Sequence, residues 1–444
     1  VHTEVVALPN GYRSASIRIE EAQYVALNDA EARAWPLSDH VSAEPLIQSQ
    51  LRYQRKHPFL LVSTLPFRRN PSTGALEKLV RFNYVISESG SDDSGSRKMN
   101  YPDHSRLASG EWFRFSVAKD GVYKLGYDFL QSLGVNTSGL TSERINVYGN
   151  HNGLLPFTNA EEVPTDLFPH SIEVIDGGDG QFGPGDFVLF YAKGPTRWTM
   201  NDSLFSHVKH VFSDSSSYFI GLDVDPPVRV QAITQSALPA TRTITRFNDR
   251  QVIDRDLVNL IKSGRTWFGE VYDLVTTYNY SFDTPNLDAS EPITLEVSVA
   301  GKTFHSGVQT NYSNFEFTSG GAFSAILPVQ SIVNSSTGAV ARVVQDTFEW
   351  NAGGNQVPLS VTFDKYDPAT SMGWMNYLRL NCVRQLRMSG DQLAFRSLES
   401  QGAGEVSEFV MEQAQLVQRI WDVTDPLNPG SVAYSTNGNQ RIFK

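Results

Sequence analysis

The single cysteine of this 444-residue chain, Cys382, is the first candidate for nucleophilic chemistry. A catalytic cysteine reacts as a thiolate, and it needs a neighbouring histidine and an electropositive setting. The segment 377–384 alternates in a way that predicts a strand with Leu378, Leu380 and Cys382 on one face. A thiol on such a leucine face behaves as a small apolar group, and burial raises its pKa. We therefore predict that Cys382 is buried and inert.

Two histidines, His207 and His210, stand three positions apart in the sequence. On a helix such a pair can share a metal ion, whereas on a strand the two side chains point to opposite faces. The surrounding sequence is typical of strand and loop, and no cluster of carboxylates or cysteines completes a ligand set. We therefore expect no metal centre at these histidines.

The glycine-rich loop 176–186 carries three aspartates, Asp176, Asp179 and Asp186. Carboxylate oxygens on a loop are ligands that Ca²⁺ prefers, so a calcium site is one prediction. The spacing differs from that of an EF-hand loop, which ends in a bidentate glutamate. The favoured alternative is a tight turn in which the aspartates accept hydrogen bonds from backbone N–H groups and the glycines adopt positive φ. No cofactor is certain, and Ca²⁺ is the one that this loop would bind.

The rest of the sequence offers no enzyme motif. It contains no G-x-S-x-G elbow, no P-loop and no H-E-x-x-H pattern. One cysteine permits neither an internal disulfide nor a cysteine-rich zinc site. The formal net charge of −11 argues against nucleic acid as a partner, because such binding needs basic side chains that displace counterions. We predict no catalytic residue in this chain.

The elements that must position these residues are strands. Aromatic residues make up 11% of the chain, and its 33 Gly and 22 Pro favour strands and turns over long helices. Apolar residues alternate with polar ones at period two, as half-buried strands require, in two sets: Ile293, Leu295, Val297 and Val299, and Leu359, Val361 and Phe363. We predict an all-β fold of several β-sandwich or jelly-roll-like domains with a few short helices.

Composition divides the chain into five parts. We predict an N-terminal β domain over 1–88, a polar Gly/Ser-rich linker over 89–110, a second β-rich domain over 111–232, a jelly-roll-like β-sandwich over 245–400, and terminal strands with a connector over 401–444. The connector is expected to lead toward a peptidase domain that this chain does not contain.

Two short helices are predicted among the strands. Phe129, Leu130 and Leu133 precede Gly134, which is typical of a short helix ended by a glycine. A second helical stretch is predicted near 256–262.

Five segments carry a resemblance to a known family. They are WFRFSVAKDGVYKL at 112–125, INVYGN at 145–150, the loop and strand at 179–191, SGRTWFGE at 263–270 and IWDVTDP at 420–426. In order and spacing these segments resemble the region upstream of the peptidase domain in gingipain-like cysteine peptidases. The peptidases in question are the surface sortases of the type IX (Por) secretion system. The resemblance implies that this chain is a non-catalytic N-terminal region of such an enzyme.

In that family a His and a Cys of an α/β caspase-like domain remove C-terminal signals from secreted cargo and attach the cargo to surface lipopolysaccharide. We expect that domain to follow Lys444, so no catalytic residue carries over to this chain. The resemblance implies four kinds of partner: an outer-membrane β-barrel shuttle protein, other attachment-complex proteins, secreted cargo and the downstream peptidase domain. It also implies a location at the cell surface, associated with the outer membrane. A removed signal peptide would explain why the chain begins at Val1, and so would a sequence that is a fragment of a longer protein; the sequence alone does not separate the two.

Two other functions remain open at this point. Jelly rolls often bind glycans through exposed aromatic rings, and Trp198, Trp267, Trp350 and Trp374 lie near predicted turns. The alternative for these rings is packing between sheets, which we favour. The second open function is that of an inhibitory pro-region of a surface cysteine peptidase. A pro-region has to be released, so cleavage is expected in the linker, at Arg97-Lys98 or Arg106.

Overall fold

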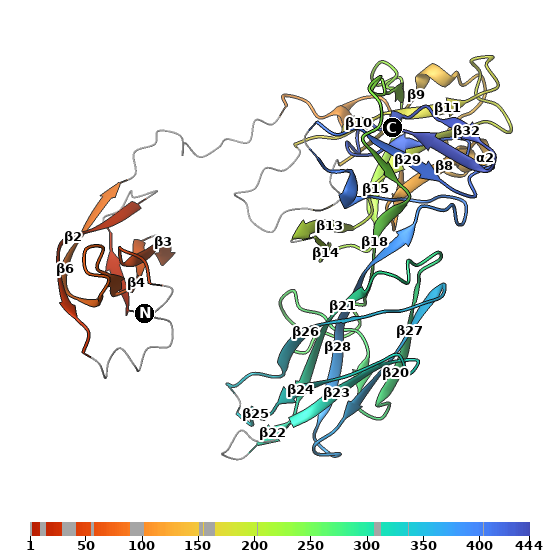
Figure 1. Ribbon diagram of the computed structural model, residues 1–444. Helices are drawn as coiled ribbons and strands as arrows, with labels where there is room; N and C mark the ends of the chain where they lie inside the picture. Colours follow the sequence, from red (N-terminus) through yellow and green to blue (C-terminus); the bar gives the residue numbers. More distant parts are fainter. Residues whose placement is uncertain are drawn as a thin grey trace. The chain divides into compact units, whose positions relative to one another are not determined.

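The computed structural model describes residues 2–8, 15–28, 41–54, 57–88, 102–150, 154, 165–201, 203–305, 312–335, 337–402 and 404–444 (Figure 1). The chain splits into two compact units, Val1–Tyr101 and Pro102–Lys444. Strands dominate both units, which confirms the predicted all-β fold. Among the described residues no helix combines the length and apolar character needed to cross a membrane.

The first unit consists of two small antiparallel sheets. One has the order β1-β4-β3 and the other β2-β6-β5. The strands are β1 (His2–Ala7), β2 (Ala15–Ala26), β3 (Leu46–Gln54), β4 (His57–Leu65), β5 (Phe67–Arg69) and β6 (Leu76–Glu88). Every second residue of β4 is buried, so Leu60 and Val62 form the centre of this small core together with Leu79 of β6.

The second unit begins with two sheets around one apolar core. The first sheet has the order β10-β9-β15-β7 and the second β11-β12-β8. The strands are β7 (Glu111–Val117), β8 (Gly121–Gly126), β9 (Ile145–Gly149), β10 (Phe168–His170), β11 (Ile172–Ile175), β12 (Phe187–Ala192) and β15 (Ser216–Leu222). The core residues include Phe115, Leu130, Val147, Phe190 and Ile220.

One predicted helix is confirmed and the other is wrong. The helix α2 (Tyr127–Ser132) ends where Gly134 adopts a φ of 95°, a conformation that glycine reaches without strain. The stretch 256–262 instead forms turns, in which Val258 and Phe268 exchange two backbone hydrogen bonds of 2.8 Å. The side chain of Asn259 accepts the Ser263 N–H at 3.1 Å and so competes with helical hydrogen bonding.

The predicted sandwich is a jelly roll (Figure 1). One sheet has the order β18-β28-β21-β26, with β19 paired to β28, and the other has the order β20-β27-β23-β24. The first strand, β18, lies beside the last, β28, and most connections cross from one sheet to the other, except at the β23–β24 hairpin, which is the jelly-roll topology. The strands are β18 (Arg246–Asp254), β19 (Val271–Tyr272), β20 (Thr277–Asp283), β21 (Ile293–Lys302), β23 (Tyr312–Ser319), β24 (Phe323–Gln330), β26 (Arg342–Trp350), β27 (Gln356–Asp364) and β28 (Met372–Gln385).

The two sheets of the jelly roll enclose the largest apolar core in the described part of the chain. The predicted alternating residues lie in it: Leu295 and Val297 of β21 and Leu359 and Val361 of β27 are all buried. Two further strands, β22 (Phe304–His305) and β25 (Ile332–Val333), pair in parallel beside it.

The C-terminal residues fold back onto the second unit as short strands. One sheet has the order β17-β29-β33-β32 and another β16-β31-β30. The strands are β16 (Gln231–Ala232), β17 (Arg242–Ile244), β29 (Ser407–Met411), β30 (Trp421–Asp422), β31 (Gly430–Ser431), β32 (Ser435–Asn437) and β33 (Gln440–Phe443). The described residues also contain the 3-10 turns η2 (Arg106–Ala108), η3 (Ser142–Arg144) and η4 (Leu398–Ser400).

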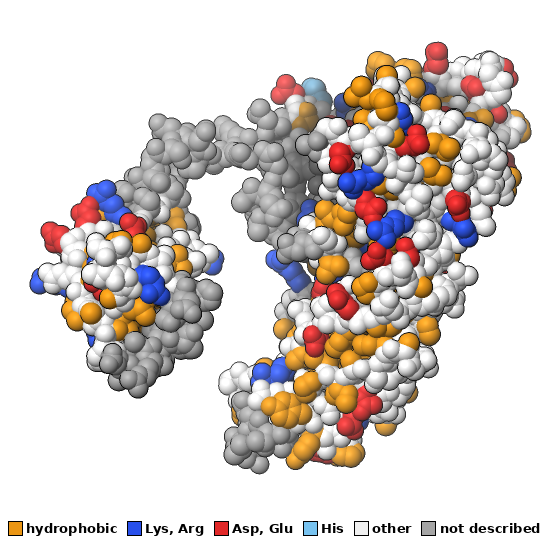
Figure 2. Space-filling view, in the orientation of Figure 1, with side chains coloured by type: hydrophobic (Ala, Val, Ile, Leu, Met, Phe, Trp, Pro, Cys, Tyr) orange, Lys and Arg blue, Asp and Glu red, His pale blue; other side chains and the backbone are white. Residues whose placement is uncertain are grey.

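The strands β13 (Thr196–Asn201) and β14 (Leu204–Lys209) form a two-stranded hairpin. It pairs with neither the β10-β9-β15-β7 sheet nor the β11-β12-β8 sheet. Its residues contact the outer face of the jelly-roll sheet that contains β18 and β28. On the face of this unit seen in Figure 2, Lys and Arg side chains are interspersed with Asp and Glu.

Candidate functional site

Cys382 lies inside the jelly roll. Its side chain is 5% exposed and belongs to the same apolar core as Leu378 and Leu380, so the predicted burial is confirmed. Burial raises the pKa of the Cys382 thiol to about 12, with a further contribution from the nearby charge of Asp249. The group is therefore a neutral thiol at physiological pH, which is the unreactive form.

The three aspartates of the 176–186 loop each accept a hydrogen bond from a nearby backbone N–H. Asp176 accepts from Gly178 at 3.0 Å, and Asp179 accepts from Gln181 at 2.8 Å. Asp186 accepts from the Gly183 N–H at 2.6 Å. A hydrogen bond from Ser142, together with that of Gly178, lowers the pKa of Asp176.

These contacts are those of a tight turn, and four glycines of the loop adopt positive φ, namely Gly177, Gly178, Gly180 and Gly185. Among the residues that the structure describes, no group of three or more His, Cys, Asp or Glu could hold a metal ion. Calcium binding by Asp176, Asp179 and Asp186 stays a prediction.

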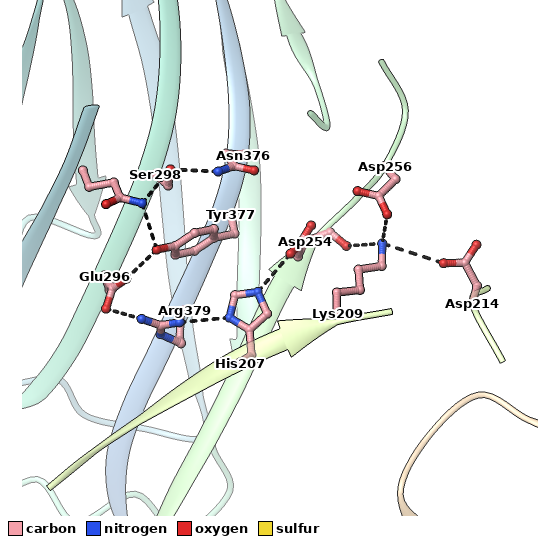
Figure 3. Close-up of polar contacts among 11 residues, drawn as sticks. His207, Lys209, Asp214, Asp254, Asp256, Glu296, Ser298, Asn376, Tyr377 and Arg379 are labelled. Atoms are coloured by element: carbon pink, nitrogen blue, oxygen red, sulfur yellow. Dashed lines mark hydrogen bonds and ion pairs between the residues drawn. The ribbon is translucent and has the colours of Figure 1, made fainter. Parts of the chain in front are cut away.

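The most concentrated set of polar contacts lies between the β13–β14 hairpin and the jelly roll (Figure 3). His207 of β14 stands at its centre, with a side chain that is 5% exposed. Its Nε2 lies 2.9 Å from Oδ2 of Asp254 on β18, and its Nδ1 lies 3.1 Å from a guanidinium nitrogen of Arg379 on β28. A guanidinium can only donate, so Nδ1 is the acceptor and Nε2 carries the proton that Asp254 accepts.

Arg379 connects the histidine to a second carboxylate. Its guanidinium forms an ion pair with Glu296 of β21, and the Tyr377 hydroxyl donates to the same carboxylate (Figure 3). Burial would raise the pKa of Glu296, but hydrogen bonds from Tyr377 and Arg379 outweigh it and hold the pKa below its usual value. Burial and the Glu296 carboxylate both raise the pKa of Tyr377, so this phenol stays protonated.

Lys209 forms a second branch of the network at the end of β14. Its ammonium group lies 2.7 Å from Asp256, 3.7 Å from Asp214 and 3.2 Å from the carbonyl oxygen of Asp254 (Figure 3). Burial would lower the pKa of Lys209, but the hydrogen bond and charge of Asp256 raise it above its usual value. The lysine is therefore a fixed cation within an acidic setting.

Asn381 holds the backbone of the hairpin. Its Oδ1 accepts the Phe205 N–H at 2.8 Å, and its Nδ2 donates to the Phe205 carbonyl at 3.2 Å. Asn381 is 8% exposed, so these are contacts shielded from water. A paired contact of this kind satisfies two main-chain groups that would otherwise be buried without partners.

The arrangement does not have the features of a hydrolytic site. Both ring nitrogens of His207 are occupied by Asp254 and Arg379, which leaves neither free to accept a proton from a nucleophile. The lone thiol of Cys382 points into the core on the opposite face of β28. The network instead fixes a hairpin of the second β domain against the jelly roll.

Sequence reasoning placed these residues only in part. It predicted a strand with Leu378, Leu380 and Cys382 on one face, which leaves the opposite face to Tyr377, Arg379 and Asn381, but it assigned that opposite face no role. The partners of His207 are 47 and 172 positions away, so no local spacing could reveal them.

Two of the four tryptophans considered for glycan binding are buried packing residues. Trp350 is 8% exposed and stacks on Phe323 with ring centroids 4.1 Å apart, and Trp374 is 5% exposed. Trp198 is half-buried beside the His207 ring at 5.7 Å, whereas Trp267 is 40% exposed.

The structure describes only one of the two predicted cleavage positions. Arg97-Lys98 lies outside the described residues. The Arg106 guanidinium forms an ion pair with Asp225, and its backbone N–H donates to Asp166 at 2.7 Å.

Comparisons with known proteins give a likeness of fold. No family model matches the sequence, and no curated protein matches it. Among solved structures, the chain is similar to dimeric latent PorU from Porphyromonas gingivalis, with a TM-score of 0.61 and 20% identity. The match covers 77% of this chain and 31% of that chain, so this chain spans about a third of the length of that structure.

A second structure, the mosquito-larvicidal Cry4Aa toxin from Bacillus thuringiensis, matches over 83% of this chain and 58% of its own with a TM-score of 0.21 and 8% identity. A TM-score this low carries no argument about function. The likeness to PorU shows that the chain has a PorU-like fold, in agreement with the predicted resemblance.

Proposed function

We propose that this chain is a non-catalytic scaffold and docking region of a type IX secretion system sortase. The observation that carries the proposal is the PorU-like fold over 77% of the chain, at a TM-score of 0.61. The chemistry of the described residues supports it, because the single cysteine is a buried neutral thiol and both ring nitrogens of His207 are held by Asp254 and Arg379. Catalysis then belongs to another domain of the parent protein.

The parent enzyme in this proposal is a gingipain-like cysteine peptidase. It removes C-terminal signals from secreted cargo and attaches the cargo to surface lipopolysaccharide. Its proposed partners are an outer-membrane β-barrel shuttle protein, other attachment-complex proteins and the cargo itself, and its proposed location is the cell surface. The ordered sequence segments between about 110 and 430 support this assignment.

The contact between the hairpin and the jelly roll suits a scaffold. Hydrogen bonds and ion pairs have strict geometry, so His207, Arg379 and Asn381 admit few orientations of the hairpin on the sheet. An apolar contact of similar area would permit sliding and repacking. We infer that the network holds the second β domain and the jelly roll as one platform.

The proposal is tested first on the gene. The coding sequence after Lys444 is expected to continue into an α/β domain with a histidine and a cysteine. The second test uses the full-length protein with Arg379→Met and Asn381→Leu in the platform. Cargo carrying a C-terminal signal should be matured more slowly than by the unsubstituted enzyme, while a small peptide substrate is cleaved at the same rate. An unrelated sequence downstream of Lys444 would contradict the proposal. Cargo maturation at an unchanged rate would also contradict it, provided that hydrogen exchange shows the hairpin to be loosened in the variant.

A further inference from the structure

A small cavity lies beside the β13–β14 hairpin. Its volume is about 250 Å³, and its walls include the rings of Trp198 and Phe205 and the side chains of Arg250, Arg396 and Ser397. It lies next to the polar network described above, but shares none of that network's charged groups. A cavity of this size is below the range typical of drug-sized ligands, so it suits a small chemical group.

Arg250 supplies the first unusual feature of this cavity. Its guanidinium carbon lies 4.5 Å from the Phe205 ring centroid and 5.3 Å from the Trp198 ring centroid, so the two rings hold it in place. Its Nε is buried and has no hydrogen-bond partner in the described part of the chain. No described carboxylate forms an ion pair with it. A shielded cation without a partner is unfavourable, so this guanidinium, which has no acid partner among the described residues, offers its donors to an anionic ligand.

The nearest carboxylates are engaged elsewhere. Asp249 pairs with Arg384 at 2.7 Å, and Asp120 forms an ion pair with Lys193. Burial lowers the pKa of the Arg250 guanidinium, and the positive charge of Arg396 lowers it further. Arg396 likewise has no ion pair with a described residue, so neither of the two guanidinium groups that line the cavity has an acid partner among the described residues.

Ser397 supplies an independent observation. Its side chain is 7% exposed, yet its hydroxyl has no hydrogen-bond partner among the described residues. Buried polar groups in native proteins are nearly always satisfied, and each exception calls for an explanation. The hydroxyl oxygen exposes almost no surface to the cavity that Ser397 lines, so it would reach a ligand only after a rotation of the side chain.

We propose that this cavity binds a carboxylate carried on a small apolar body. The planar donor fork of an arginine matches the two oxygens of a carboxylate, and Arg250 and Arg396 provide two such groups. Trp198 and Phe205, with Met200 on the same wall, receive the apolar part of the ligand. The site is separate from the proposed scaffold function and stands or falls independently of it.

The test uses benzoate as the probe, because it joins a carboxylate to a planar apolar ring. Binding to the full 444-residue chain is followed by saturation-transfer NMR, with benzamide as the neutral probe of the same shape. Benzoate is expected to bind saturably, and benzamide at least about tenfold more weakly, because it cannot form charge-assisted hydrogen bonds. Equal binding of the two compounds would overturn the proposal. So would displacement of benzoate by an equal concentration of inorganic phosphate, which would indicate a general anion site.

Variants locate the binding in the cavity. Arg250→Gln and Arg396→Ala are each expected to weaken benzoate binding about tenfold or more. Arg387→Ala is the control, since Arg387 pairs with Glu412 and does not line the cavity. If Arg250→Gln fails to fold by circular dichroism, Arg396→Ala decides the result, because the Arg396 side chain is exposed and tolerates removal. Unchanged benzoate binding by folded Arg396→Ala would overturn the proposal.

Discussion

The two faces of β28 are both shielded from water, by opposite means. On the inner face Leu378 and Leu380 are fully buried in the jelly-roll core, next to Cys382. On the outer face Arg379 and Asn381 are 6% and 8% exposed, because the β13–β14 hairpin lies against them. The inner face is stabilised by apolar burial without directional contacts, whereas the outer face depends on hydrogen bonds and ion pairs of defined geometry.

This difference shows what a period-two pattern can and cannot tell. Alternation assigns side chains to one face or the other, and an apolar face is reliably a core face. A polar face is ambiguous, since the same residues suit contact with water or a polar contact with another element. On β28 the polar face is a buried contact between the β13–β14 hairpin and the jelly-roll sheet, and that contact suits the proposed scaffold role.

The largest expected effect comes from the inner face. Leu380→Ala removes a fully buried side chain and leaves a cavity, so we expect the free energy of unfolding to fall by about 2–5 kcal/mol. Urea denaturation measures it. Leu274→Ala is the matched control, since Leu274 is 97% exposed and its loss should change stability by at most about 0.5 kcal/mol. Similar losses of unfolding free energy in both variants would show that Leu380 does not lie in the core.

A smaller effect is expected on the outer face. Arg379→Met deprives Glu296 and His207 of a charged donor and should cost about 1.5–3 kcal/mol in unfolding free energy. Arg387→Met is the control, because the Arg387–Glu412 pair is on the surface and is worth at most about 1 kcal/mol. Hydrogen exchange should also become faster at the Phe205 amide in Arg379→Met only. If the two arginine variants behave alike, the hairpin contact is not a buried network.

The outer face should also respond to acid. The pKa of Glu296 is lower in the folded state than its usual value. A carboxyl of this kind adds stability above its unfolded pKa of about 4.3 and loses it as the pH falls through the folded value. From pH 7 to pH 3 the unfolding free energy should therefore drop less in Glu296→Gln than in the unsubstituted chain. Glu316→Gln on β23 serves as the control, and a matching drop in all three proteins would contradict this account.

The smallest effect concerns the thiol itself. With a pKa near 12 and 5% exposure, Cys382 should resist alkylation by iodoacetamide at pH 8 in the folded chain. In denaturant the same thiol should react fully within the same time. Mass spectrometry counts the added groups, and rapid labelling of the folded chain would place Cys382 at the surface.

Much of the fold could be predicted because local pattern and global structure agree there. The alternating residues of β21 and β27 belong to the jelly-roll core, and Gly134 ends the helix α2 at the predicted place. The stretch 256–262 misled because its apolar spacing suits a helix, whereas the Asn259 side chain and the Val258–Phe268 bridge impose turns. Propensity is a weak guide where side-chain hydrogen bonds compete with the backbone.

The site residues were harder to predict than the fold. The inert character of Cys382 followed from its neighbours on one strand face, which is local information. The contacts of His207 with Asp254 and Arg379 join elements far apart in the sequence, and a single sequence holds no signal for such pairs. The same limit applies to Arg250 and Arg396, which only the folded chain brings to one cavity.

The central claim is that this chain supports catalysis without performing it. The most direct measurement incubates the purified chain with a secreted cargo protein that carries its C-terminal signal, and follows both by mass spectrometry. We expect no cleavage of the cargo and no covalent adduct on Cys382. Cleavage that is abolished by Cys382→Ala would contradict the account.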